Sequence, residues 1–175
     1  MDATRIQELL DQKKAITEQL SLIAEEGFQR LKIIAEMILA RSKEFNEENP
    51  HHTECVFTPS PWLDDYGMEE IADARIKRYD IFPNEIRITF EWYVGSNRFV
   101  NADGRIKISE VSMPIQDFEQ SIRLWLRDRE DEWKKDQEAE VETLERFEMK
   151  CLQERFGSDE RTARERLAEL QAKYK

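Results

Sequence analysis

Apolar residues recur at helical spacing in a first long segment, about residues 4 to 46. A threonine and a glutamine at capping-box spacing, Thr4 and Gln7, mark its start. The first half carries a heptad-like stripe, which consists of Ile6, Leu9, Ile16, Leu20 and Ile23. After Gly27 the stripe shifts by one residue, to Phe28, Leu31, Ala35 and Ile38. This pattern predicts a helix with a coil-like first half and a more deeply packed second half, and Gly27 marks either a bend or a close contact.

A second segment, about residues 115 to 156, shows the same helical periodicity after Met113-Pro114. Its beginning is strongly apolar, with Ile115, Phe118, Ile122, Trp125 and Leu126 on one face. Further along, the face thins to Trp133, Val141, Leu144, Phe147, Cys151 and Leu152. Gly157 is a natural stop and Ser158 can cap a last short helix. Both long helices therefore concentrate their packing surface where they adjoin the stretch between them.

The stretch between the two segments contains every proline of the chain and alternates as strands do. Residues 85 to 94 place Ile86, Ile88, Phe90, Trp92 and Val94 on one face. Residues 105 to 111 repeat the alternation, residues 54 to 58 fit an edge strand, and residues 71 to 82 fit a strand, with a helical turn at 68 to 74 as the alternative. An antiparallel meander of three or four strands is expected.

The expected fold class is α+β. Two long antiparallel helices, coiled-coil-like, flank a small antiparallel sheet of three to four strands, with a short C-terminal helix. The boundaries are 1–49, 50–113, 114–157 and 158–175, all in one structural unit. This layout resembles that of the prefoldin-type holdase chaperones in the arrangement of its elements, without a shared motif.

Charge narrows the range of partners. The net charge is −11, and 37% of the residues are charged. The most acidic window, residues 128–148, has ten acidic residues against four basic ones. Phosphate contacts need clustered lysine and arginine, so direct binding of nucleic acid is disfavoured. A basic protein partner, or imitation of nucleic-acid charge, fits this composition.

One stretch of the chain resembles a calcium-binding loop. The segment Asn101-Ala102-Asp103-Gly104-Arg105-Ile106, with Glu110, aligns with several loop positions, but Phe99 occupies the first ligand position. Its flanks have strand character, and Asp-Gly is a common hairpin signal. We therefore expect a β-turn at Asp103-Gly104.

The histidines and cysteines do not assemble a recognisable active site. His51-His52-Thr53 resembles half of a two-histidine phosphoesterase site, but the chain has no further histidine for the second half. The cluster of His51, His52, Glu54 and Cys55, with Asp64 or Asp65, offers metal ligands without a standard zinc spacing. We expect a polar loop, no cofactor and no metal. Catalytic serine motifs and phosphate-cradling glycine loops are also missing from the sequence.

Two residue sets remain as candidates for binding. The first set would contact a macromolecular partner, and it comprises Trp62, Trp133, Glu138, Glu140 and Glu142. The two tryptophans serve either as interface anchors or as caps on the core. The second set would hold an anion or a nucleotide between protomers, and it comprises Arg75, Arg78, Arg87 and Arg98.

The leading functional hypothesis is a non-catalytic acidic interaction protein, oligomeric through its helices, that acts as inhibitor, adaptor or scaffold. A mobile-element inhibitor of host nucleic-acid-binding machinery is one version, by analogy of composition. The alternative is an oligomeric small-ligand binder, and an enzyme is the least favoured class. No run approaches a membrane span, and the distant Cys55 and Cys151 suit a reducing cytoplasm.

Overall fold

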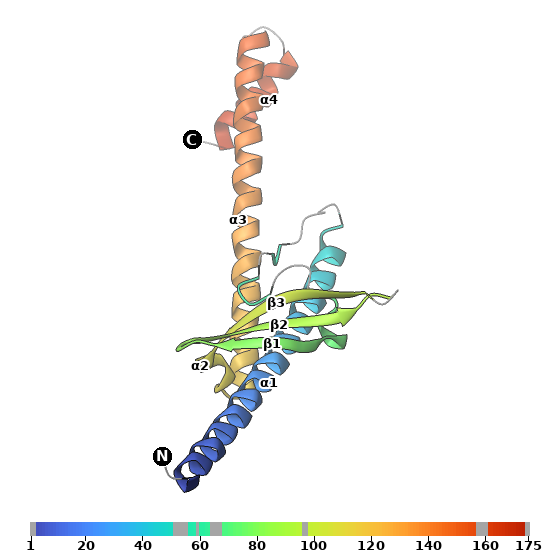
Figure 1. Ribbon diagram of the computed structural model, residues 1–175. Coiled ribbons are helices and arrows are strands. Elements are labelled where there is room, and N and C mark those ends of the chain that lie inside the picture. Colours follow the sequence, from blue (N-terminus) through green and yellow to red (C-terminus); the bar gives the residue numbers. More distant parts are fainter. Residues whose placement is uncertain are drawn as a thin grey trace. The chain divides into compact units, whose positions relative to one another are not determined.

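The computed structural model describes residues 3–50, 56–58, 60–63, 68–95, 98–156 and 161–173. It confirms the α+β class (Figure 1). The long helices are α1 (Ala3–Glu48) and α3 (Ile115–Phe156), and α4 (Arg161–Lys173) is the short C-terminal helix. Between α1 and α3 in the chain lies a three-stranded antiparallel sheet. The chain divides into two compact units, Met1–Arg127 and Asp128–Lys175.

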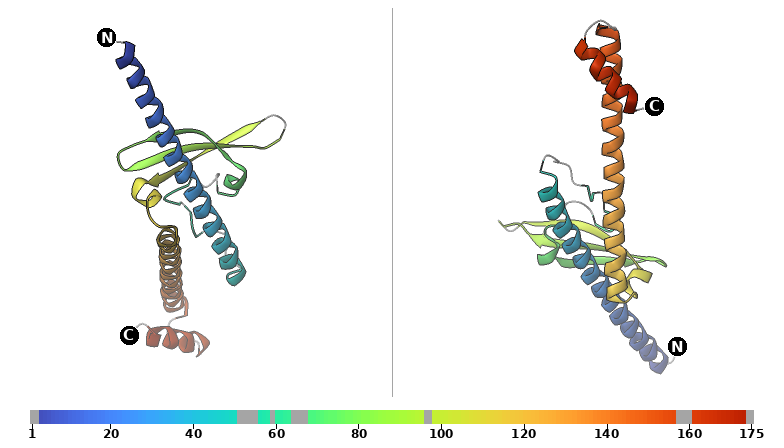
Figure 2. Two further views of the ribbon diagram at one scale, coloured as in Figure 1. Left: turned by 90° about the horizontal axis from the view of Figure 1, so that it is seen from below. Right: turned by 180° about the vertical axis from the view of Figure 1, so that it is seen from behind.

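The sheet consists of β1 (Arg75–Ile81), β2 (Glu85–Tyr93) and β3 (Phe99–Lys107), in the order β1-β2-β3. The alternation expected for β2 is confirmed within the strand, because Ile86, Ile88 and Phe90 are fully buried while Arg87 and Tyr93 are exposed. The expectation for Val94 is wrong, since this residue follows the strand and is 50% exposed. The edge strand β1 has an irregular register between Ile76 and Arg78. The buried face of the sheet is covered by α1, which crosses it in both views of Figure 2.

The second half of α1 supplies the cover that this sheet needs. The predicted stripe of Phe28, Leu31, Ala35 and Ile38 is buried, and each of these side chains is at most 2% exposed. The helix begins at Ala3, one residue before its expected start, but Thr4 does not occupy the capping position that the sequence suggested. Thr4 already lies inside α1, and the Gln7 amide donates to the carboxylate of Asp11 at 3.0 Å. Thr4 is thus a helical residue rather than the residue that caps the helix.

Two predictions for the segment around β3 are wrong. Asp103-Gly104 is not a turn but lies within β3, paired with Thr89 and Ile88, which also removes the basis for a calcium loop. Residues 108–111 are not strand but form the short helix α2 (Ile108–Val111). Glu110 favours this turn by accepting a bond from the backbone N–H of Lys107 at 2.8 Å.

The predicted edge strand at 54–58 is not seen in its described part. Residues 51–55 lie outside the described residues, and Val56-Phe57 form a turn. Leu63, rather than residues 54–58, lies beside β3, where it makes an isolated bridge to Gly104. Next to this bridge, the backbone N–H of Arg105 donates to Trp62 O at 2.8 Å. Before β1, residues Ile71–Asp73 form a 3-10 turn, so strand begins at Arg75.

Two glycines allow α1 to approach the sheet closely. A β-carbon on Gly27 would lie 3.2 Å from Ile106 Cγ2 and 3.4 Å from Ile88 Cδ1. On the sheet side, a β-carbon on Gly104 would lie 2.5 Å from Leu31 Cδ1. Of the two roles proposed for Gly27, the close contact is therefore present. Leu31 occupies the space that a side chain at position 104 would need.

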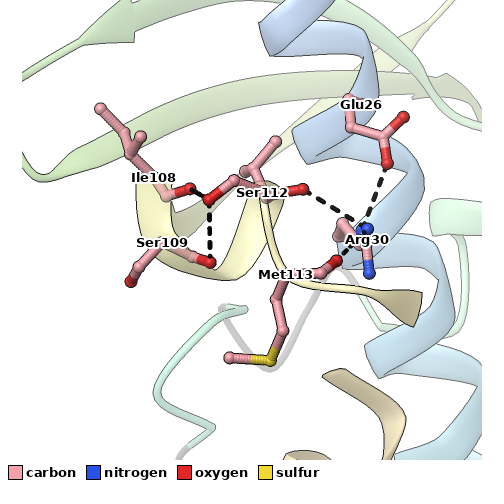
Figure 3. A network of polar contacts seen from close by, with 7 residues as sticks. Glu26, Arg30, Ile108, Ser109, Ser112 and Met113 are labelled. Carbon is pink, nitrogen blue, oxygen red and sulfur yellow. Dashed lines mark hydrogen bonds and ion pairs between the residues drawn. The ribbon is translucent and has the colours of Figure 1, made fainter. Parts of the chain in front are cut away.

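Arg30 joins α1 to the segment that leads into α3 (Figure 3). Its Nη2 donates to the carbonyl oxygens of Met113 at 2.8 Å and Val111 at 3.4 Å. Its Nε donates to Glu26 Oε1 at 3.3 Å, and its guanidinium carbon lies 4.9 Å from the centroid of the Phe118 ring. With only 8% of its side chain exposed, Arg30 fixes the beginning of α3 against α1.

The second unit consists of α3 from Asp128 onward and α4. Leu170 of α4 is buried, with 2% exposed, and Lys173 pairs with Glu145 of α3. An apolar and an ionic contact therefore hold α4 in this unit. The Ser158 cap and the Gly157 stop lie outside the described residues.

Replacing Gly104 with valine should lower the free energy of unfolding by about 1–3 kcal/mol, because the new side chain would overlap Leu31. Leu31→Ala alone should cost about 2–5 kcal/mol. The double variant should cost less than the sum by at least about 0.5 kcal/mol, since the alanine removes the overlapping atoms. Urea denaturation measures all three values. Asp103→Val, on the exposed face of the same strand, is the control. A double variant whose cost equals the sum of the two single costs would contradict the contact between position 104 and Leu31.

Arg30→Met should destabilise the protein by about 1.5–3 kcal/mol per lost charged hydrogen bond, because the two carbonyl groups lose their donor while the apolar stem is kept. Urea denaturation of the purified variant measures this. Gln29→Met, at the exposed neighbouring position, should stay within about 0.5 kcal/mol of wild type. Equal stability of the two variants would exclude Arg30 as a structural anchor.

Candidate interaction surfaces

The first half of α1 exposes apolar side chains that the core does not use. Their exposed fractions lie between 37% and 70%. The residues concerned are Ile6, Leu9, Leu10, Ile16, Leu20, Leu22 and Ile23. Ala24, the next residue, is only 1% exposed, so the core begins abruptly at this point. We call the heptad-spaced subset, Ile6, Leu9, Ile16, Leu20 and Ile23, the α1 seam.

The residues beside the α1 seam are mostly uncharged. Lys13 occupies the one polar position within the heptad pattern, between Leu9 and Ile16. The flanking positions of a heptad are often charged, but here they hold Leu10, Gln12, Thr17 and Gln19. Apart from Arg5 and Glu26 at the two ends of the flank, charged side chains lie farther round the helix and pair with each other, as Lys14 does with Glu18. Another helix could therefore meet the seam without facing a row of acidic residues.

The second unit holds the predicted acidic residues. Glu138 and Glu142 line one cleft of about 410 Å³, together with Gln137, Val141 and Lys173. Glu140 is exposed but is not part of that lining. Glu142 pairs with Arg146, so its charge is partly offset. The structure thus brings two of the three glutamates together.

Exposed apolar residues accompany this acidic surface. Val141, Leu144 and Phe147 of α3 are 50–64% exposed. They follow one another at three-residue intervals, which places them along one side of the helix. Trp133 is half-buried in the same unit. This part of α3 therefore offers apolar area together with negative charge.

Trp62 caps the core, one of the two roles that the sequence left open for it. It is 9% exposed, and its indole N–H donates to Glu110 Oε1 at 3.2 Å. Its ring meets that of Trp125 edge-on, with centroids 5.3 Å apart. These contacts join the loop before β1 to α2 and to the beginning of α3. They leave little of Trp62 to anchor a partner.

The four predicted arginines do not converge on one site. Arg75 donates to Glu91 at 2.9 Å, and Arg87 pairs with Glu85 at 2.7 Å. Arg78 donates to Thr89 Oγ1 at 3.1 Å. The backbone N–H of Arg98 donates to Gly95 O, beside the connection from β2 to β3.

A cleft of about 450 Å³ gathers Arg78, Arg87 and one further arginine, Arg105. Asp80 and Asp103 line the same cleft and offset much of the positive charge. Arg105 is also engaged, since its Nε donates to Pro61 O at 3.0 Å. The cleft is a mixed-charge surface, which suits an anion less well than three arginines alone would.

The histidine and metal-binding candidates all fall in two short stretches, residues 51–55 and 64–65. His51, His52, Glu54, Cys55, Asp64 and Asp65 lie outside the described residues. Among the residues that the structure does describe, no group of three or more metal-ligating side chains comes together. No helix in that part of the chain is long and apolar enough to cross a membrane.

Comparisons with protein families, with curated proteins and with solved structures found no match to this chain. The exposed surfaces of the chain are therefore the features that bear on its function. The α1 seam is the largest group of exposed apolar side chains described above, and it lies on a single regular helix.

Two residues of these surfaces were not predicted in the roles that the structure gives them. Arg105 lies directly across from Arg87 in the sheet, and alternation from Ile106 would have placed it on the polar face. The carboxylate of Glu110 accepts hydrogen bonds from the Lys107 N–H and from the Trp62 indole N–H, although Lys107 and Trp62 are far apart from each other in sequence. Strand alternation could have revealed the first residue. The spacing of Glu110 after Lys107 is that of a capping box, but no local signal points to its bond with Trp62.

Glu110→Ala should lower the free energy of unfolding by about 1–3 kcal/mol, because the indole N–H of Trp62 would be buried without its acceptor. Urea denaturation followed by tryptophan fluorescence measures the change. Trp62→Phe should cost less in the Glu110→Ala background than in wild type. Glu119→Ala removes a half-exposed glutamate that pairs with Arg123, and should cost about 0–1 kcal/mol. A Glu110 effect no larger than this control would argue against the bridge.

Proposed function

We propose that this protein is a non-catalytic interaction protein that binds a macromolecular partner through its helices, as an adaptor, scaffold or inhibitor. The α1 seam is its main contact surface. The observation that carries this proposal is the exposure of seven large aliphatic side chains between Ile6 and Ile23, immediately before a fully packed core. The remaining surfaces modulate which partner is accepted.

An apolar surface of this kind is energetically costly to leave in water. Full burial of one leucine or isoleucine is worth roughly 1.5–3 kcal/mol. Scattered apolar side chains are normal on protein surfaces, but a contiguous group on one helix is typical of an interaction site. Association through the α1 seam would recover part of this energy. A helix is the natural partner, because the spacing matches knobs-into-holes packing.

The architecture of the first unit supports a role in presenting this helix. Residues from Ala24 to Phe45 of α1 are anchored by the sheet and by Arg30, so the preceding turns belong to a helix that is already formed. A preformed helix loses little conformational entropy on binding. The core would thus act as a base that orders the contact surface.

Charge favours particular partners. The net charge of −11 and the exposed glutamates of α3 would attract basic protein surfaces and repel nucleic acid. Inhibition of a host nucleic-acid-binding machine by a mobile-element protein is a narrower form of the same proposal. A reducing cytoplasm is the compartment that we propose for this activity.

Introducing charge into the seam should abolish association without unfolding the protein. Leu9→Glu with Leu20→Glu places two carboxylates at seam positions that are exposed in the free chain. Sedimentation velocity over a range of concentrations, and affinity capture of bound chains from source-cell lysate, compare the variant with wild type. The apparent affinity should fall by at least about tenfold, which corresponds to 1.4 kcal/mol. Thermal unfolding of the first unit should be unchanged.

Gln7→Glu with Ser21→Glu is the matched control, since it adds the same charge away from the seam. Wild type and control should retain the same chains, whether copies of this protein or another protein. If the seam variant retains everything that wild type retains, and neither self-associates differently, the proposed function is wrong.

A further inference from the structure

We propose that the occupant of the α1 seam is a second copy of this chain, bound antiparallel about a two-fold axis that passes between Lys14 and Ala15. This inference rests on the proposed function and specifies its partner. The axis places Ile6 opposite Ile23 of the partner subunit, Leu9 opposite Leu20 of the partner subunit, and Lys13 opposite Ile16 of the partner subunit. Symmetry repeats each of these pairs.

The spacing of the seam is symmetric about its own centre. Read from either end, the positions of Ile6, Leu9, Lys13, Ile16, Leu20 and Ile23 follow the same sequence of intervals. An antiparallel pair of identical helices therefore brings every seam position into a layer with another seam position. Such a contact uses the same patch on both chains, as a closed two-fold dimer requires.

Lys13 argues for the antiparallel direction. In a parallel, in-register pair, the two Lys13 side chains would face each other inside the seam, where like charges repel. In the antiparallel pair, each Lys13 packs its aliphatic stem beside Ile16 of the partner subunit. Its ammonium group can then extend to water past the uncharged Gln12 and Gln19 positions.

The flanks of the seam complement each other in the same direction. Antiparallel pairing places Arg5 beside Glu26 of the partner subunit, and Gln12 beside Gln19 of the partner subunit. Both Arg5 and Glu26 are exposed in the described chain, and each has a partner on its own helix. The parallel arrangement would instead place Arg5 beside Leu10 of the partner subunit, which gains no ionic contact.

The free length of α1 also matches this pairing. The exposed part runs from Thr4 to Ile23, and burial in the core begins at Ala24. With the proposed axis, the beginning of one helix lies level with Glu26 of the other, where α1 enters its own core. The overlap thus covers the exposed turns of α1, about 30 Å at 1.5 Å per residue, and stops where the core begins.

Spin labels at three exposed positions on one side of α1 test the orientation. Single cysteines replace Gln7, Lys14 or Ser21 in full-length protein that carries Cys55→Ser and Cys151→Ser, and dipolar spectroscopy measures the distance between labels within the dimer. Antiparallel pairing offsets two labels at position 7 by about 22 Å along the axis, at position 21 by about 20 Å, and at position 14 by about 1.5 Å. The distance should therefore be shortest at position 14 and clearly longer at both others.

The outcomes separate this inference from the proposed function. Sedimentation first establishes that each labelled protein forms a dimer of wild-type affinity. Three similar distances would mean a parallel dimer and overturn the inference, although the seam would still be a contact surface. A monomer at all concentrations, with another protein lost on Leu9→Glu and Leu20→Glu substitution, would also overturn it while preserving the proposed function. A monomer that loses nothing on that substitution would overturn both.

Discussion

The first unit depends on the close approach of α1 to the three-stranded sheet. Gly27 on the helix and Gly104 on β3 leave the two surfaces without side chains at the points where they would collide. Leu31 then occupies the space above Gly104, and the isoleucines of β2 and β3 reach the helix backbone. Close packing of this kind tolerates few changes in side-chain volume, so the path of α1 over the sheet is closely defined.

A defined path for α1 also decides which of its apolar residues remain outside the core. The sheet is short, and it covers the helix only from Ala24 onward. The same repeat of large aliphatic residues continues toward the N-terminus, where the first unit provides no second layer in its described part. Intramolecular packing thus explains half of the apolar pattern of α1. Under the proposed function, association through the α1 seam would account for the other half.

The sequence predicted the long elements well, because helical and strand periodicities are local and repeat many times. The ends of α1 and α3 and the alternation of β2 follow from such patterns. Asp103-Gly104 was misinterpreted because Asp-Gly is a common turn signal, whereas here the glycine makes room for Leu31, which is distant in the sequence. Ile108 alternated like a strand residue, but Glu110 caps a helical turn there. The role of Trp62 depended on Glu110 and Trp125, which only the fold brings near.

The irregular register of β1 has a consequence for how copies of this chain can meet. An exposed edge strand offers unpaired backbone groups to another strand, and a bulge or charged side chains on that edge discourage such pairing. β1 has both, with its register interrupted between Ile76 and Arg78 and with Arg75, Lys77 and Asp80 exposed along it. Growth of the sheet from one molecule into the next is therefore obstructed. Assembly that proceeds through helices can close on itself and stop, whereas strand addition would have no natural end.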